Sequence, residues 1–144
     1  MDLTWHLDQQ QMKQERKSIM HCTAWIEFGS RLNSKLVQPK LMWKSCSAKY
    51  CYPYSIDLLD ICGIFHHPDE NNNFNIRDFP FARKPFSFII ETTFGAIYVF
   101  EIPDRKTRLR IIHGLKLLVS ELGSMVASGY GYMEYFTPTG FIDA

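Results

Sequence analysis

Residues 85–122 read PFSFIIETTFGAIYVFEIPDRKTRLRIIHGLKLLVSEL, and two apolar runs joined by a short turn are followed there directly by a helical pattern. Large apolar residues occupy every second position at the start of the first run, residues 86–91, and a second run follows at residues 96–102. This alternation around the turn Thr-Thr-Phe-Gly is typical of a β-hairpin. The segment therefore predicts two antiparallel strands and then a helix.

The helical pattern begins after Pro103, where Asp104 can act as the N-cap of a helix that runs to about residue 128. Apolar residues recur along it at steps of three and four positions: Leu109, Ile112, Leu115, Leu118, Val119, Leu122, Met125 and Val126. A stripe this wide must be buried against another element, and the predicted sheet is the only large partner. We therefore expect the helix to close the open end of a bent antiparallel sheet.

Several shorter strands are predicted upstream of the hairpin. Residues 18–28 have the composition of a strand, and residues 36–44 form a second one whose Pro39 indicates an edge or a bulge. Residues 47–65 predict one or two more strands. Residues 66–85 contain four asparagines and three prolines, the composition of a long exposed loop.

The chain has 144 residues, of which 46% are hydrophobic, enough for one core and too few for two independent domains. We divide it into a polar N-terminal extension at residues 1–17, a folded domain at residues 18–128 and an aromatic tail at residues 129–144. In the extension, Leu3 and Leu7 are spaced to share one face of a short helix that Asp2 could cap.

Bulk composition narrows the classes of function. A formal net charge of +1 with 22% charged residues argues against a general nucleic-acid binder. No apolar run reaches the roughly 18 residues of a membrane-spanning helix, and the N-terminus lacks the pattern of a secretory signal. We expect the four cysteines to be free thiols and the protein to be cytoplasmic, either peripheral at a membrane or part of a large complex.

The order of these elements resembles the pleckstrin-homology-like (PH-like) fold. The residues that carry the resemblance are TAWIEFGSR at 23–31 for its first strand and turn, KLMWK at 40–44 for its second strand, SIDL at 55–58 for its fourth, and the hairpin with its helix at 86–126. The resemblance implies a mainly β fold, a partly open barrel of about seven antiparallel strands in two near-orthogonal sheets, capped by one amphipathic C-terminal helix. It also implies a non-enzymatic interaction module.

Phosphoinositide-binding members of that family place a basic residue late in the first strand and a Lys/Arg-x-Arg pair in the second. Here Glu27 lies near the first position and Lys40-Leu41-Met42 does not complete the second, which weakens the lipid interpretation. Four cations remain as a candidate site for an anionic lipid head group or an acidic peptide: Arg31, Lys35, Lys40 and Lys44. The alternative is that they only keep a strand edge from aggregating.

Two further groups are candidate contacts for a protein partner. Four cations crowd the first turns of the predicted helix, where the helix dipole disfavours them by a few tenths of a kcal/mol each: Arg105, Lys106, Arg108 and Arg110. Aromatic residues, which are enriched at interfaces, occupy the hairpin tip and the tail: Phe94, Tyr130, Tyr132, Tyr135, Phe136 and Phe141. The alternatives are a solvated helix terminus that tolerates its charges and a tail that packs on its own domain.

Little in the sequence points to catalysis or to a cofactor. Zinc ligands could come from Cys46 and Cys51 with Cys62, His66 and His67, but the spacing is unusual and thiols among apolar residues serve as small hydrophobes. Glycine-rich phosphate loops, nucleophile elbows and metalloprotease pairs are absent from the sequence.

We therefore predict a protein-docking adaptor or small subunit with no metal and no cofactor. The alternative is a module that binds anionic membranes. A third possibility, an enzyme on a small barrel, would require a concave pocket with convergent polar groups.

Overall fold

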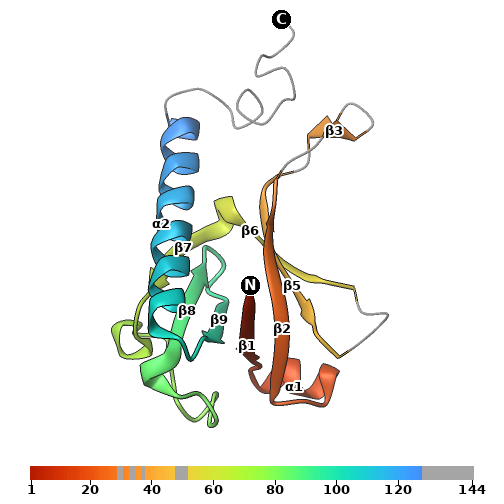
Figure 1. Ribbon diagram of the computed structural model, residues 1–144, viewed down its shortest axis with the longest axis vertical. Helices are drawn as coiled ribbons and strands as arrows, with labels where there is room; N and C mark the ends of the chain where they lie inside the picture. The colour runs from red at the N-terminus through yellow and green to blue at the C-terminus, as the bar shows by residue number, and fades with distance from the viewer. Residues whose placement is uncertain (29–30, 33–34, 37, 48–51, 128–144) are drawn as a thin grey trace, which may run out of the picture.

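The computed structural model describes residues 1–28, 31–32, 35–36, 38–47 and 52–127. Its main feature is one antiparallel sheet of seven strands in the order β6-β5-β2-β1-β9-β8-β7, with a separate β3–β4 ribbon (Figure 1). The strands are β1 (Asp2–His6), β2 (Ile19–Glu27), β3 (Arg31–Leu32), β4 (Lys35–Leu36), β5 (Lys40–Ser45), β6 (Tyr54–Asp57), β7 (Ile61–Phe65), β8 (Ser87–Thr92) and β9 (Ile97–Glu101). The helices are α1 (Gln9–Glu15), α2 (Arg105–Ala127) and the 3-10 turns η1 (Leu58–Asp60), η2 (Pro68–Glu70) and η3 (Lys84–Phe86).

The sheet is strongly curled. Trp43 on β5 and Phe100 on β9 have ring centroids 5.2 Å apart, although β2 and β1 lie between these strands. In a flat sheet, strands three places apart would be separated by about 14 Å. The two ends of the sheet therefore face each other across a shared core, as Figure 1 shows.

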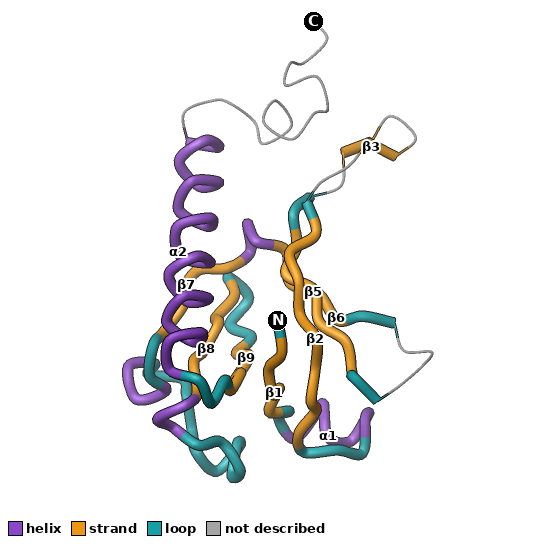
Figure 2. Tube along the Cα trace, in the orientation of Figure 1, coloured by secondary structure: helices purple, strands orange, loops and turns teal. Residues whose placement is uncertain are grey.

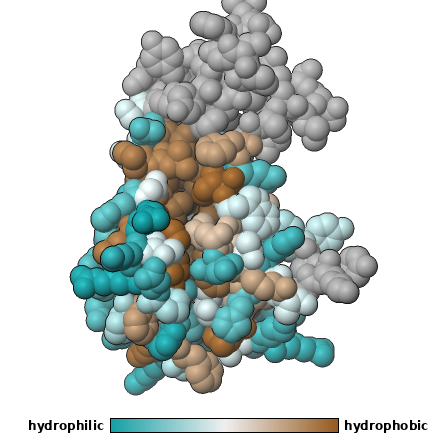
Figure 3. Space-filling model, viewed as in Figure 1, coloured by the Kyte–Doolittle hydropathy of each residue, from teal (hydrophilic) through white to brown (hydrophobic). Residues whose placement is uncertain are grey.

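Helix α2 covers the opening of the curled sheet and contacts η1 and β7. Its buried side chains Ile112, Leu115 and Leu122 belong to the main core, and apolar residues gather beside its C-terminal half (Figure 3). Asp104 accepts a hydrogen bond from the Thr107 amide at 3.2 Å, as the predicted N-cap should. The predicted fold class, a partly open barrel of antiparallel strands capped by one helix, is confirmed.

The predicted helix at the start of the chain is wrong for residues 2–6. These residues form β1, the central strand, which pairs with β2 and with β9. Leucines four residues apart fit both a helix and a strand, but Trp5 between them is buried on the same side, which is the period of a strand. The helix begins only at Gln9, where Asp8 and Gln11 form a capping box.

Because β1 comes first, each following strand of the main sheet stands one place later in chain order than the resemblance assigned it, up to the segment at 40–44. The segments at 23–31 and 40–44 belong to the second and third strands of the main sheet, and not to the first and second. The segment at 55–58 overlaps the fourth strand, as predicted, and residues 86–126 hold the predicted hairpin and lid helix.

The predicted loop at residues 66–85 contains η2 and the start of η3 and packs on the outer face of the sheet. Phe79 forms a second small core there with Ile89 and Val99. Strands β8 and β9 are consequently covered on both faces, and the loop is held close to the outer side of β1. Among the described helices, none is both long enough and apolar enough to cross a membrane.

Candidate functional site

A groove of about 600 Å³ lies on the outer face of the sheet, the side opposite the core. Its floor is formed by β1 with its two neighbours β2 and β9, and one wall comes from the loop that precedes β8. We call it the outer-face groove, and these residues carry the argument: Thr4, His6, Ile19, His21, Phe81, Arg83 and Glu101.

The alternation of β1 explains how these side chains meet. Leu3, Trp5 and Leu7 are buried in the core, so Thr4 and His6 between them face outward. The strand register sets Thr4 opposite His21 on β2 and opposite Glu101 on β9. One row of polar side chains thus crosses the three central strands.

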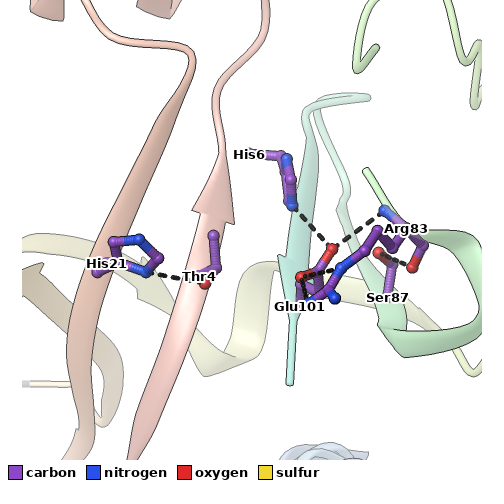
Figure 4. A network of polar contacts seen from close by, with 6 residues as sticks. All are labelled: Thr4, His6, His21, Arg83, Ser87 and Glu101. Atoms are coloured by element: carbon purple, nitrogen blue, oxygen red, sulfur yellow. Dashed lines mark hydrogen bonds and ion pairs between the residues drawn. The ribbon is translucent and has the colours of Figure 1, made fainter. Parts of the chain in front are cut away.

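Glu101 organises the floor of the groove (Figure 4). One carboxylate oxygen lies 3.2 Å from His6 Nε2 and accepts the Arg83 backbone N–H at 3.0 Å. The other accepts from Arg83 Nε at 3.0 Å and from Nη2 at 2.6 Å. Ser87 Oγ donates to the Arg83 carbonyl at 2.8 Å, so the loop is tied to β8 as well as to β9.

Burial and charge set the protonation of this network. Burial tends to raise the pKa of Glu101, but the hydrogen bonds from Arg83 and the charges of His6 and Arg83 outweigh it, and the pKa is lowered. Burial lowers the pKa of His6, and the attraction of Glu101 offsets only part of that effect. At neutral pH the floor therefore holds an ionised carboxylate, a neutral imidazole and a guanidinium.

Two exposed apolar side chains stand at the rim of the groove, which also includes the exposed Asp2 and Cys46. Phe81 is 64% exposed and Ile19 is 38% exposed, on opposite sides of the polar floor. Exposed aromatic and aliphatic side chains beside a few fixed polar groups are the usual composition of a binding pocket. The Arg83–Glu101 contacts fix the loop that carries Phe81 and so fix the position of this wall.

The groove offers little for nucleophilic chemistry. Among the described residues, His6 has only Glu101 as a hydrogen-bond partner, and no hydroxyl or thiol lies within its reach. Thr4 Oγ1 lies 3.2 Å from His21 Nδ1, and Cys46 Sγ lies 3.3 Å from Thr23 Oγ1. Within the described ranges, no group of three or more His, Cys, Asp or Glu residues is placed to hold a metal ion.

The two described cations of the predicted lipid site, Lys40 and Lys44, have different neighbours. Lys40 lies opposite Glu27 and Asp57 in the sheet, and Lys44 Nζ lies 6.0 Å from the ring centroid of Trp25. The side chains of Arg31 and Lys35, on the β3–β4 ribbon, lie outside the described residues.

Arg108 differs from the other predicted partner contacts because it is buried, at 4% exposed. Its Nη1 donates to the His66 carbonyl at 3.0 Å and ties α2 to the end of β7. Its inclusion among exposed partner contacts was therefore wrong. The remaining helix cations are exposed: Arg105, Lys106 and Arg110. Phe94 at the hairpin tip is exposed too. The predicted tail contacts lie outside the described residues: Tyr130, Tyr132, Tyr135 and Phe136.

Cys46, which also lines the groove, was weighed as a zinc ligand, but none of the seven residues named above was among the predicted site residues. The alternation of residues 3–7 was the one signal that could have placed Thr4 and His6 on a shared outer face. The contact of Glu101 with His6 joins residues 95 positions apart, and no local pattern reports it.

Comparisons of the chain with protein-family models, with curated proteins and with solved structures found no match in any of the three. The functional argument therefore depends on the geometry of the site.

Proposed function

We propose that this chain is a non-enzymatic PH-like interaction module that docks a protein partner, as an adaptor or a small subunit of a larger assembly, through the outer-face groove. The observation that carries the proposal is the pair of exposed apolar residues, Phe81 and Ile19, held on either side of the buried Glu101 network.

The groove suits an extended segment of a partner that inserts one apolar side chain. Its volume of about 600 Å³ is within the range of ordinary binding pockets. The floor is fixed by hydrogen bonds before any partner arrives, so docking would lose little conformational entropy there. Thr4 and His21 at the edge of the floor offer polar groups that can orient the backbone of the segment.

A peptide-display selection tests the proposal. The full chain is immobilised and screened against a library of random peptides, and the enriched peptides are mapped by amide chemical shifts. We expect shifts centred on β1, β2 and residues 79–83, and loss of binding in Phe81→Asp and Ile19→Asp. Leu117→Asp is the matched control, because Leu117 is also exposed, at 63%, but lies on α2. Failure to enrich any peptide, or binding that persists in both groove variants, would contradict the proposal.

The alternative, recruitment to anionic membranes, gains no support from the described residues, because Lys40 faces two carboxylates. Sedimentation with phosphoinositide vesicles compares the wild-type chain with a variant in which four residues are alanine: Arg31, Lys35, Lys40 and Lys44. Vesicle binding that depends on these four residues would favour the alternative.

A further inference from the structure

A second cavity, of about 190 Å³, lies on the inner side of the curled sheet next to α1. We call it the mouth pocket. Aromatic side chains from four strands line it: Trp5, Trp43, Tyr54 and Tyr98. It is separate from the outer-face groove because Trp5 faces the core while its neighbours Thr4 and His6 face outward. Figure 2 shows α1 lying across this end of the strands.

The rings meet at different angles: Trp43 and Tyr54 are nearly parallel, at 19° with centroids 6.0 Å apart, and the other pairs are steeper. Trp5 and Trp43 are inclined at 75° with centroids 5.5 Å apart, and Trp43 and Tyr98 are inclined at 74° with centroids 5.6 Å apart. The indole nitrogens of Trp5 and Trp43 are buried and have no hydrogen-bond partner in the described part of the chain. Trp5 and Trp43 are each 1% exposed, so most of the accessible aromatic surface of the pocket comes from the half-buried Tyr54 and Tyr98.

The side of the mouth pocket formed by α1 is polar, and among the described residues that line the pocket the one charged side chain is Glu15. Gln11, Gln14 and Glu15 line the pocket from α1, where steps of three and four residues put them on one helix face. The side chain of Glu15 makes no hydrogen bond or ion pair within the described residues, and none of the described residues that line the cavity is a Lys, Arg or His. Asp8 lies near Tyr98, whose pKa is raised first by burial and then by the Asp8 charge.

Helix α1 fixes the backbone position from which Glu15 reaches the pocket. The capping box of Asp8 and Gln11 fixes its first turn, with the Gln11 amide donating to Asp8 at 2.8 Å. Arg16 adopts the left-handed conformation, φ 56°, and its amide donates to the Met12 carbonyl at 2.7 Å, which ends the helix. Met12 packs against the core from the same helix.

We propose that the mouth pocket binds a trimethylated ammonium group. A quaternary ammonium is attracted to the negative faces of aromatic rings, cannot donate hydrogen bonds and keeps its charge at every pH. It therefore matches a cavity with aromatic walls and one carboxylate on its rim. The cavity has space for about six water molecules at about 30 Å³ each, which exceeds the size of a trimethylammonium head.

This chemistry occurs in choline-type molecules and in trimethyl-lysine side chains, and two probes distinguish the sources. Choline chloride and a short peptide with one trimethyl-lysine are titrated separately into the ¹⁵N-labelled full chain, and the indole N–H signals are followed. We expect the Trp5 and Trp43 signals to move and the Trp25 signal to stay, since Trp25 does not line the cavity. Tighter binding of the peptide identifies a protein side chain as the ligand, and tighter binding of choline identifies a small molecule or lipid head group.

Two controls separate a cation site from an ordinary apolar cavity. The neutral isostere 3,3-dimethylbutan-1-ol has the shape of choline without its charge, and we expect it to bind at least about fivefold more weakly. Glu15→Gln preserves size and should weaken choline binding by about the same factor, whereas Lys13→Gln, an exposed position of α1 that does not line the pocket, should leave it unchanged.

Circular dichroism confirms that both variants keep the fold. Equal binding of choline and its isostere would overturn the proposal, as would choline binding that Glu15→Gln does not weaken, or absence of any shift at Trp5 and Trp43 with either probe. None of these outcomes depends on the outer-face groove.

Discussion

The replacement Ile112→Ala tests whether α2 closes the curled sheet. Ile112 is fully buried, at 0% exposed, and belongs to the main core together with residues from β1, β5, β8 and β9. Leu117, five residues further along the same helix, is 63% exposed. Leu117→Ala therefore removes three side-chain carbons from the same helix without opening a cavity in the core.

The expected cost follows from the atoms removed. Three buried carbons contribute about 2.4 kcal/mol at about 0.8 kcal/mol each. The cavity left in a packed core adds to this, and measured Ile→Ala changes in cores reach about 2 to 5 kcal/mol. Alanine favours the helix by about half a kcal/mol, which acts in the opposite direction. We expect a net loss of about 3 kcal/mol for Ile112→Ala and less than about 0.5 kcal/mol for Leu117→Ala.

Urea unfolding followed by far-ultraviolet circular dichroism measures both variants. Ile112→Ala should move the midpoint to lower urea with an unchanged slope, because the fold and the surface exposed on unfolding stay the same. A loss below about 1 kcal/mol, or equal losses for the two variants, would mean that α2 does not pack on the sheet. The fold and both proposed sites would then lose their basis.

Three further predictions concern protonation, backbone strain and thiol reactivity. The folded pKa of Glu101 lies below its unfolded value of about 4.3, so its contribution to stability is complete above that pH and is lost as the pH falls through the folded pKa; Glu101→Gln should flatten this acid dependence in thermal melts. Gly95 has φ +82°, and Gly95→Ala should cost about 1 kcal/mol in urea unfolding even though open space surrounds it. Burial raises the pKa of Cys22 to about 12, so Cys22 should resist a thiol reagent at pH 8 while the exposed Cys62 reacts.

The elements that the sequence predicts well are those whose signal is local. Alternation at residues 86–91 and the stripe beginning at Leu109 each report one period, and both the hairpin and the helix are observed there. Residues 2–7 are too short for two leucines to decide the period, and only Trp5 between them distinguishes a strand from a helix. The strand observed there moves the next two strands one place along the sheet's chain order.

The two sites could not be predicted for a different reason. The outer-face groove requires Arg83 to reach Glu101 across a loop of irregular structure, and the mouth pocket requires the sheet to curl until Trp43 approaches Phe100. Both depend on long-range geometry that the propensities of single segments do not contain. Arg108 illustrates the converse: its position in a charged helix turn predicted exposure, but packing against the end of β7 buried it.

Strand β1 connects the two proposed sites because its alternating side chains serve one site on each face. A slip of one residue against β2 and β9 would turn Trp5 to the outer face and bring Thr4 and His6 into the core. The described residues of the main core are apolar and offer no charged partner for an imidazole, whereas the observed register gives His6 the carboxylate of Glu101 at 3.2 Å. The burial of Trp5 and the pairing of His6 therefore favour the same register. It follows that destabilising β1 should abolish both sites together, while Phe81→Asp should abolish peptide docking and leave choline binding intact.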